Sequence, residues 1–166
     1  MRRALVLACL AGFCFAGDVD IAKEAYKNED FKKAFEYFEK GCKSGNAGSC
    51  GMVGTAYYKG VAAEQNYTKA FEYFKKGCDG LDIASCGFVG GAYYDGAGVK
   101  KDYFKAFEYY KKACDGGDAW SCGVIGYLYE YGEGVKKDTN KALEFYSKTC
   151  EMKEQLGCES YERLKK

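Results

Sequence analysis

Eight cysteines recur at a fixed spacing along this chain and could carry its chemistry. They form four pairs with seven residues between the partners, and each pair begins 36 residues after the one before it. The pairs are Cys42 and Cys50, Cys78 and Cys86, Cys114 and Cys122, and Cys150 and Cys158. Cysteine thiols can form disulfides, bind metal ions or catalyse thiol exchange. The regular spacing indicates one small unit copied along the chain, with the same cysteine chemistry in every copy.

Metal binding and redox catalysis both favour a closer spacing of cysteines. Zinc sites usually hold two cysteines about two to four residues apart, often with histidine, and this chain has no histidine. Redox catalysts separate their cysteines by about two residues. We therefore predict structural disulfides within each pair, because pairing Cys50 with Cys78 instead would leave Cys42 and Cys158 without partners. The sequence predicts no metal site and no cofactor.

The balance of charges bears on the class of partner. The chain has 25 Lys and Arg against 24 Asp and Glu, a formal net charge of +1, so neither nucleic acid nor an anionic membrane surface is a favoured partner. Hydrophobic residues make up 48% of the chain, with 16 Tyr and 11 Phe, which is ample material for a core. Proline is absent, which suits helices that are interrupted by glycine.

The first 16 residues have the pattern of an export signal. A basic start is followed by 12 apolar residues, too few to span a bilayer, and small side chains suit cleavage before Gly17. Cleavage there removes Cys9 and Cys14 and leaves the eight paired cysteines. We therefore expect a secreted or periplasmic protein that does not span a membrane, in a compartment that permits disulfides. Lipidation at Cys9 is the alternative.

The copies have the pattern of helical hairpins. The second helix of each hairpin follows an Asp or Asn that can cap its N-terminus, at Asp30, Asn66, Asp102 and Asp138. The first helix carries an internal glycine such as Gly90, which we expect to make room for a bulky neighbour, Phe107 or Tyr110. Glycine-rich turns join the two helices, and the turn at 60–63 lacks the second glycine, which leaves its conformation open.

These features predict an all-α protein, an α/α superhelix (solenoid) of helical hairpins cross-linked by four disulfides. The last segment has polar residues where earlier copies have Gly and Val, as expected of a capping helix whose outer face is exposed to solvent. We expect an export signal at 1–16, a divergent first hairpin at 17–45, repeats at 46–81, 82–117 and 118–153, and a capping helix at 154–166.

One copy carries a motif that resembles a known family. It consists of Val89-Gly90, Tyr93, Gly96-Ala97-Gly98-Val99, Asp102-Tyr103, Lys105-Ala106, Tyr109-Tyr110 and Lys112-Ala113. This motif resembles the Sel1-like repeat, a relative of the tetratricopeptide repeat, and the added bridge is similar to that of the Helicobacter cysteine-rich proteins. The resemblance implies an exported solenoid. It also implies penicillin binding with slow β-lactam hydrolysis, hence a β-lactamase, with a β-lactam or a peptidoglycan fragment as ligand.

The residues contain no standard machinery for that hydrolysis. A serine β-lactamase needs Ser-x-x-Lys, and no serine here has a lysine three positions later. Without histidine, a zinc enzyme and a Ser-His-Asp triad are both excluded. Ser49, Ser85 and Ser121 recur beside the cysteines, and we interpret them as helix-start hydrogen-bonding residues. The catalytic residues of any hydrolysis stay unknown.

Candidate binding residues lie where the copies differ, on the concave face that tetratricopeptide geometry assigns to the first helices. The candidates are Thr55, Tyr58, Lys59, Tyr94, Asp95, Trp120, Tyr127, Glu130 and Tyr131. Trp120, Tyr127 and Tyr131 fall on one stripe of one helix and could anchor a peptide, a glycan or a small ring ligand. The alternative is that they pack under the capping helix.

The tyrosines that occur in every copy are expected to serve the core instead. They are Tyr57, Tyr93 and Tyr129. The second hypothesis for function is therefore a non-catalytic interaction scaffold that binds a protein, peptide or cell-wall ligand in its concave groove.

Overall fold

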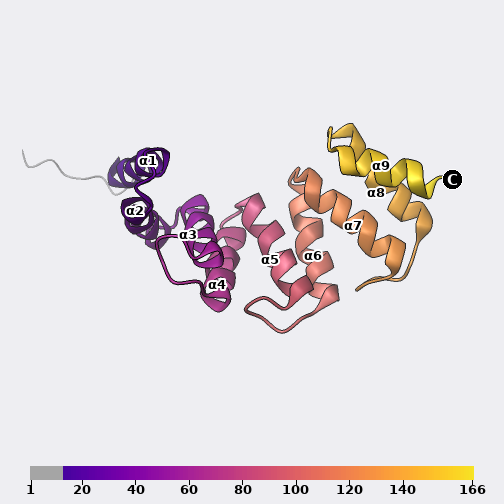
Figure 1. Ribbon diagram of the computed structural model, residues 1–166, viewed down its shortest axis with the longest axis horizontal. Coiled ribbons are helices and arrows are strands. Elements are labelled where there is room, and N and C mark those ends of the chain that lie inside the picture. The colour runs from indigo at the N-terminus through magenta and orange to yellow at the C-terminus, as the bar shows by residue number, and fades with distance from the viewer. Residues whose placement is uncertain (1–12) are drawn as a thin grey trace, which may run out of the picture.

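The computed structural model of the protein describes residues 13–166, with side chains from residue 17 onward. This part of the chain is all-α, as predicted, and forms an elongated, arched stack of helices (Figure 1). The helices are α1 (Phe13–Lys27), α2 (Phe31–Lys43), α3 (Ala47–Lys59), α4 (Tyr67–Asp79), α5 (Ile83–Asp95), α6 (Tyr103–Asp115), α7 (Ala119–Tyr131), α8 (Thr139–Glu151) and α9 (Gln155–Leu164).

The predicted export signal at 1–16 lies outside the described residues except for 13–16, which begin α1. Cleavage before Gly17 would leave the larger part of that helix in place. Among the described helices, none is both long and apolar enough to cross a membrane.

Consecutive helices pack as hairpins, and their starts are fixed by side-chain caps. Asp102 accepts a hydrogen bond from the Lys105 backbone N–H at 3.0 Å, and the corresponding Asp or Asn caps α2, α4 and α8 in the same way. These are the caps that the sequence predicted. The odd-numbered helices α3, α5 and α7 are capped by Asn46, Asp82 and Asp118. Each cap satisfies a backbone N–H that the helix itself leaves unpaired.

Two glycines are required by close approaches between elements. A Cβ on Gly90 would lie 2.9 Å from the Tyr110 ring, so Tyr110, of the two expected neighbours, is the side chain that needs the space. A Cβ on Gly98 would lie 2.1 Å from the Tyr67 carbonyl oxygen, at a φ of 74°. The corresponding Ala62 adopts the same left-handed conformation, with φ 65°, so the turn without a second glycine keeps this backbone shape.

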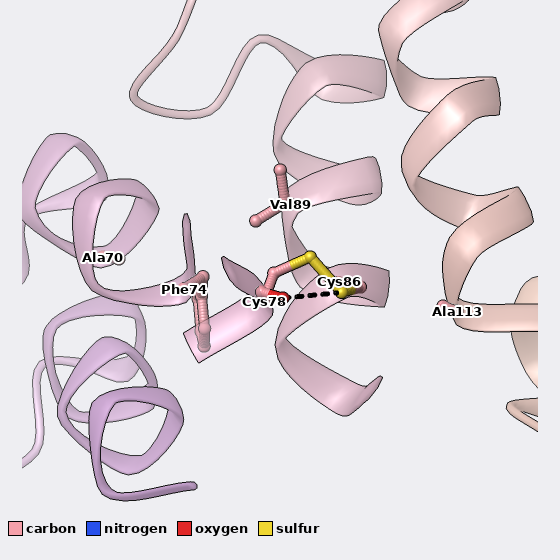
Figure 2. Packing of buried hydrophobic residues seen from close by; sticks show 6 residues of the cluster. All are labelled: Ala70, Phe74, Cys78, Cys86, Val89 and Ala113. Atoms are coloured by element: carbon pink, nitrogen blue, oxygen red, sulfur yellow. Dashed lines mark hydrogen bonds between the residues drawn. A yellow bond between two sulfur atoms is a disulfide. The ribbon is translucent and has the colours of Figure 1, made fainter. Parts of the chain in front are cut away.

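Four disulfides join each even-numbered helix to the start of the next odd-numbered one, with the predicted pairing. The bridged Cα atoms lie 4.5 to 4.7 Å apart. Figure 2 shows Cys78 and Cys86 bridged beside Phe74 and Val89, all of them buried. The dashed line there joins the Cys86 sulfur to the Cys78 carbonyl oxygen at 3.7 Å, a close contact only, since a bridged sulfur carries no proton. The bridges therefore cross-link successive hairpins, and both cysteines are buried in the two middle bridges, Cys78–Cys86 and Cys114–Cys122.

The tyrosines found in every copy pack between hairpins, as expected. The Tyr93 ring meets the edge of Phe71 at 5.3 Å and stacks on Tyr109 at 5.6 Å, while the Lys105 ammonium lies 5.3 Å from its centroid. Tyr57 and Tyr129 repeat this arrangement in their own copies. Each such tyrosine touches both its own hairpin and the preceding one, so it helps to set their relative position.

One exposed leucine holds a strained backbone conformation. Leu81 has a φ of 71° and 78% of its surface is exposed, whereas Gly45 and Gly117 occupy the corresponding positions of the neighbouring copies, also with positive φ. A left-handed conformation costs a non-glycine residue about 1–2 kcal/mol.

We expect Leu81→Gly to stabilise the protein, because it removes this cost and loses little buried surface. The free energy of unfolding should rise by about 1 kcal/mol, with Tm higher by a few degrees in a thermal melt. The matched change Gly117→Leu should lower Tm by a similar amount, since no neighbouring atom obstructs a side chain there and only the backbone is strained. A lower Tm for Leu81→Gly would contradict the prediction.

Candidate functional site: an aromatic groove across the odd-numbered helices

Three bays follow one another along the face of the odd-numbered helices. The N-terminal bay is lined by α1, α3 and α5 with one residue of α2, and has a volume of about 660 Å³. The central bay is lined by residues from α3 to α7 and has about 490 Å³, and the C-terminal bay is lined by residues from α5 to α9 and has about 420 Å³. Neighbouring bays share lining residues, so they form one continuous groove. The first helices of the hairpins thus line a groove, as tetratricopeptide geometry suggested.

Large aromatic side chains form the ridges between bays. Phe88 lines both the N-terminal and the central bay, is 46% exposed, and stacks on buried Phe74 with ring centroids 4.5 Å apart. Trp120 lines both the central and the C-terminal bay and packs edge-on against Tyr110 at 5.6 Å. Because each ridge rests on a buried ring, both are held in place without a ligand.

Most of the candidate binding residues line this groove. Thr55 lines the N-terminal bay and Tyr58 the central bay, while Tyr94 and Tyr127 line the C-terminal bay. Asp95 and Trp120 line the two bays on either side of their ridge.

Lys59 and Tyr131 do not line any of the three bays. Both are exposed, and the Tyr131 ring packs against Tyr127 at 4.5 Å. Trp120 is 53% exposed, so packing under the capping helix does not account for it.

Glu130 is not the exposed groove residue that the sequence suggested. It is 7% exposed and receives both guanidinium nitrogens of Arg163, each at 2.7 Å, together with the Tyr146 hydroxyl at 2.8 Å. The Arg163 guanidinium first, and then the Tyr146 hydroxyl, hold the pKa of the Glu130 carboxyl below its usual value although burial opposes this. Glu130 therefore fastens the capping helix α9 to α7 and α8.

The Tyr110 hydroxyl has a different environment from that of Tyr146, its counterpart one copy later. Tyr110 is 2% exposed and lines both the central and the C-terminal bay, yet its hydroxyl has no hydrogen-bond partner in the described part of the chain. Burial, and then the charges of Asp95 and Asp118, raise the pKa of Tyr110, which keeps the hydroxyl protonated. It is therefore a donor that the protein leaves free at the groove.

Sequence reasoning missed Phe88 and Tyr110. Phe88 varies between copies, with Met52 and Val124 at the corresponding positions. A search for positions at which the copies differ could therefore have found it. Tyr110 replaces Phe74 of the preceding copy, and the added hydroxyl was the available signal.

Most of the chain matches the model of one protein family. The Sel1 repeat matches residues 24–46, 47–80, 83–118 and 122–153. The chain belongs to the Sel1 repeat family. Helicobacter pylori cysteine rich protein B is 34% identical, with a TM-score of 0.61, and the match covers 78% of this chain and 92% of that one. The resemblance to the cysteine-rich type of Sel1 protein is thereby confirmed.

Two further solved structures share the fold of this Sel1 repeat protein. A Sel1 repeat protein from Oxalobacter formigenes has a TM-score of 0.83 over 92% of this chain and 64% of its own. A protective antigen present in uropathogenic Escherichia coli strains has a TM-score of 0.82 over 86% of this chain and 32% of its own. Both are 24% identical and are similar in fold alone. Among curated proteins, none matches the chain.

We expect Arg163→Met to weaken the attachment of α9, because it removes a bidentate ion pair to the buried Glu130 carboxylate. The free energy of unfolding at neutral pH should fall by about 1–2 kcal/mol, measured by urea titration. Because the folded-state pKa of Glu130 is lowered, the pair contributes fully above the unfolded pKa of about 4.3 and its contribution is lost as pH falls through the lower folded value. The difference between wild type and variant should therefore shrink in acid.

The matched control for this prediction is Lys165→Met. Lys165 is the C-cap of the same helix, its ammonium lies 5.5 Å from the centroid of the Tyr161 ring, and it has no carboxylate partner in the described structure. It should change stability little at any pH. A wild-type–Arg163→Met difference that stays constant from neutral pH into acid would show that the ion pair is not its source.

Proposed function

We propose that this Sel1 repeat protein is an exported, non-catalytic scaffold that holds an extended segment of a partner protein in its groove. The observation that carries the proposal is the row of three linked bays along the odd-numbered helices. A row of shallow sites suits a linear ligand that offers a side chain to each bay, more than a compact molecule that would fill one.

The free Tyr110 hydroxyl supports a peptide ligand. The Tyr110 side chain is buried as a whole, but its hydroxyl oxygen keeps contact with solvent and has no acceptor within the described protein, so it is available to donate to a ligand. The carbonyl groups of an extended peptide are such acceptors, repeated along its length. The exposed rings of Phe88 and Trp120 add apolar anchors on either side.

Export is supported by three observations. The chain carries four disulfides, which persist in oxidising compartments. Its first 16 residues have the composition of an export signal. Its solved relative from Helicobacter pylori is also a cysteine-rich protein. We therefore propose a secreted or periplasmic location.

Penicillin binding and β-lactam hydrolysis, implied by the family resemblance, find no specific support in the groove. The serines that recur in the copies are 0 or 1% exposed, and the hydroxyls of Ser85 and Ser121 donate to the capping carboxylates of Asp82 and Asp118. A serine nucleophile needs access to its substrate and a nearby base. The scaffold is therefore the better-supported function.

We expect purified, oxidised protein to form no adduct with a penicillin and to release no product above the buffer background. Intact-mass spectrometry and product chromatography measure the two quantities. Saturable turnover that survives repurification and is lost when the protein is inactivated by reduction would establish the enzyme and overturn a purely non-catalytic scaffold.

Filling the central bay should abolish peptide binding. Gly91 lines this bay, and the corresponding position of the next copy holds Tyr127, so the helix accepts a tyrosine there. We expect wild-type protein to retain members of a soluble degenerate peptide library and Gly91→Tyr to retain at least about tenfold less, because a ring would occupy the bay. Affinity selection followed by mass spectrometry measures the retained peptides.

Glu108→Tyr is the control for added aromatic surface. Glu108 is exposed on α6 and lines none of the bays, so this variant should retain peptides as wild type does. Circular dichroism and Tm establish that both variants are folded. Equal retention by Gly91→Tyr and wild type, or no retention by wild type, would contradict the proposed function.

A further inference from the structure

The charged side chains of the central and C-terminal bays all have the same sign. Asp95 and Asp118 line the central bay, Asp95 and Glu154 line the C-terminal bay, and no Lys or Arg lines either. The chain as a whole is nearly neutral, with a formal net charge of +1, so this is a local property of the groove. A ligand that enters these two bays meets carboxylates and aromatic rings.

The Asp95 and Glu154 carboxylates both lack a partner within the described protein, and of these two Asp95 is the one that lines both bays. It is exposed at the end of α5 and makes no hydrogen bond or ion pair within the described residues. Comparable aspartates at the ends of even-numbered helices are paired, Asp79 with Lys75 and Asp115 with Lys111, each at 2.6 Å. Asp118 uses one carboxylate oxygen to cap α7.

The ridge beside Asp95 offers an aromatic face to a cation. Trp120 lines the same two bays as Asp95 and is 53% exposed. An indole ring is the aromatic group that attracts cations most strongly. The molecule already uses this interaction elsewhere, because lysine ammonium groups lie 5.0 to 5.3 Å from the centroids of the repeated tyrosines.

An acidic group beside an aromatic ring would not by itself define a site, but Tyr110 adds an independent observation. Its side chain is almost wholly buried, its hydroxyl is unpaired, and it lines the same two bays as Asp95 and Trp120. The hydroxyl is a donor, so it complements a neutral acceptor of the ligand while Asp95 complements a cation. A peptide residue with a basic side chain carries both groups.

We propose that the ridge of Asp95, Tyr110 and Trp120 seats a lysine or arginine side chain of an extended partner segment. The ammonium or guanidinium group lies between the Asp95 carboxylate and the face of Trp120, and the Tyr110 hydroxyl donates to a nearby backbone carbonyl of the partner. This inference rests on the proposed function and names the chemistry of its partner, a basic segment of polypeptide.

The N-terminal bay has a different charge and gives the bound segment a direction. Lys23 and Lys27 of α1 line that bay with Asp82, whereas the ridge near α7 is acidic. A segment with its basic residue on the ridge therefore places its acidic or neutral residues toward α1.

The test uses Trp120 as the reporter, since it is the single tryptophan of the chain. Three degenerate libraries of short peptides have only uncharged residues at the random positions. They differ at a fixed central residue, which is Lys, Gln or Glu. Protection of Trp120 from acrylamide quenching measures the occupancy of the ridge. We expect the Lys library to bind roughly tenfold more tightly than the Gln library, and the Glu library to bind most weakly.

Asp95→Asn should reduce the preference for Lys over Gln to about threefold or less, because the carboxylate that pairs with the cation is gone. Because Asp95 has no partner in the described structure, the variant should remain folded. Asp115→Asn makes the same change of net charge outside the groove and should keep the full preference.

The outcomes separate the two proposals. Equal protection by all three libraries, or a preference lost equally in Asp95→Asn and Asp115→Asn, contradicts the proposed site for a basic side chain. Peptide binding in the groove would still hold. A preference unchanged in Asp95→Asn also contradicts the site for a basic side chain. Failure of every library to protect Trp120 overturns the groove as a peptide site, and the site for a basic side chain with it.

Discussion

The position of each hairpin on the next depends on a disulfide at the junction between them. A solenoid has no single centre, so every unit is held only by its neighbours, and an error at one junction displaces all later units. Here each junction is short and carries a bridge whose Cα atoms are about 4.6 Å apart. In the chain-entropy account, such a bridge over a short loop stabilises the fold by about 2–3 kcal/mol. Its more specific effect is geometric, because it fixes where an odd-numbered helix begins relative to the preceding even-numbered one.

The groove inherits its shape from these junctions. Its bays lie between odd-numbered helices of different hairpins, which touch one another little and are held in line through the even-numbered helices and the bridges. The Trp120 ridge lies at a repeat position that holds Gly48, Ala84 and Leu156 in the other copies. The Phe88 ridge lies at another position, where the neighbouring copies hold Met52 and Val124. Copies that share a backbone thus line the groove differently through a few such positions.

The fold could be predicted from the sequence because its determinants recur. The cysteine spacing, the capping Asp and Asn residues and the glycines recur at the same spacing in several copies, so each copy supports the same structural prediction. The role of Glu130 could not be read this way. Its partner Arg163 lies 33 residues later in the capping helix, and the copies that carry Tyr58 and Tyr94 instead give no hint of an ion pair. Tyr110 was missed for a related reason, since its period marks it as core and only the hydroxyl, absent in Phe74, is directed to the groove.

Two polar groups of the groove, the Tyr110 hydroxyl and the Asp95 carboxylate, have no partner within the described protein. By contrast, Glu130 is hydrogen-bonded to Arg163 and Tyr146, and Asp79 and Asp115 at the ends of α4 and α6 form ion pairs with lysines. The Tyr110 hydroxyl and the exposed Asp95 carboxylate can therefore bind a ligand without first breaking a contact within the protein. A groove held rigid by disulfides also loses little conformational entropy when a ligand binds. The unpaired Tyr110 and Asp95, which line the same two bays, are thus a physical argument that this groove binds a ligand.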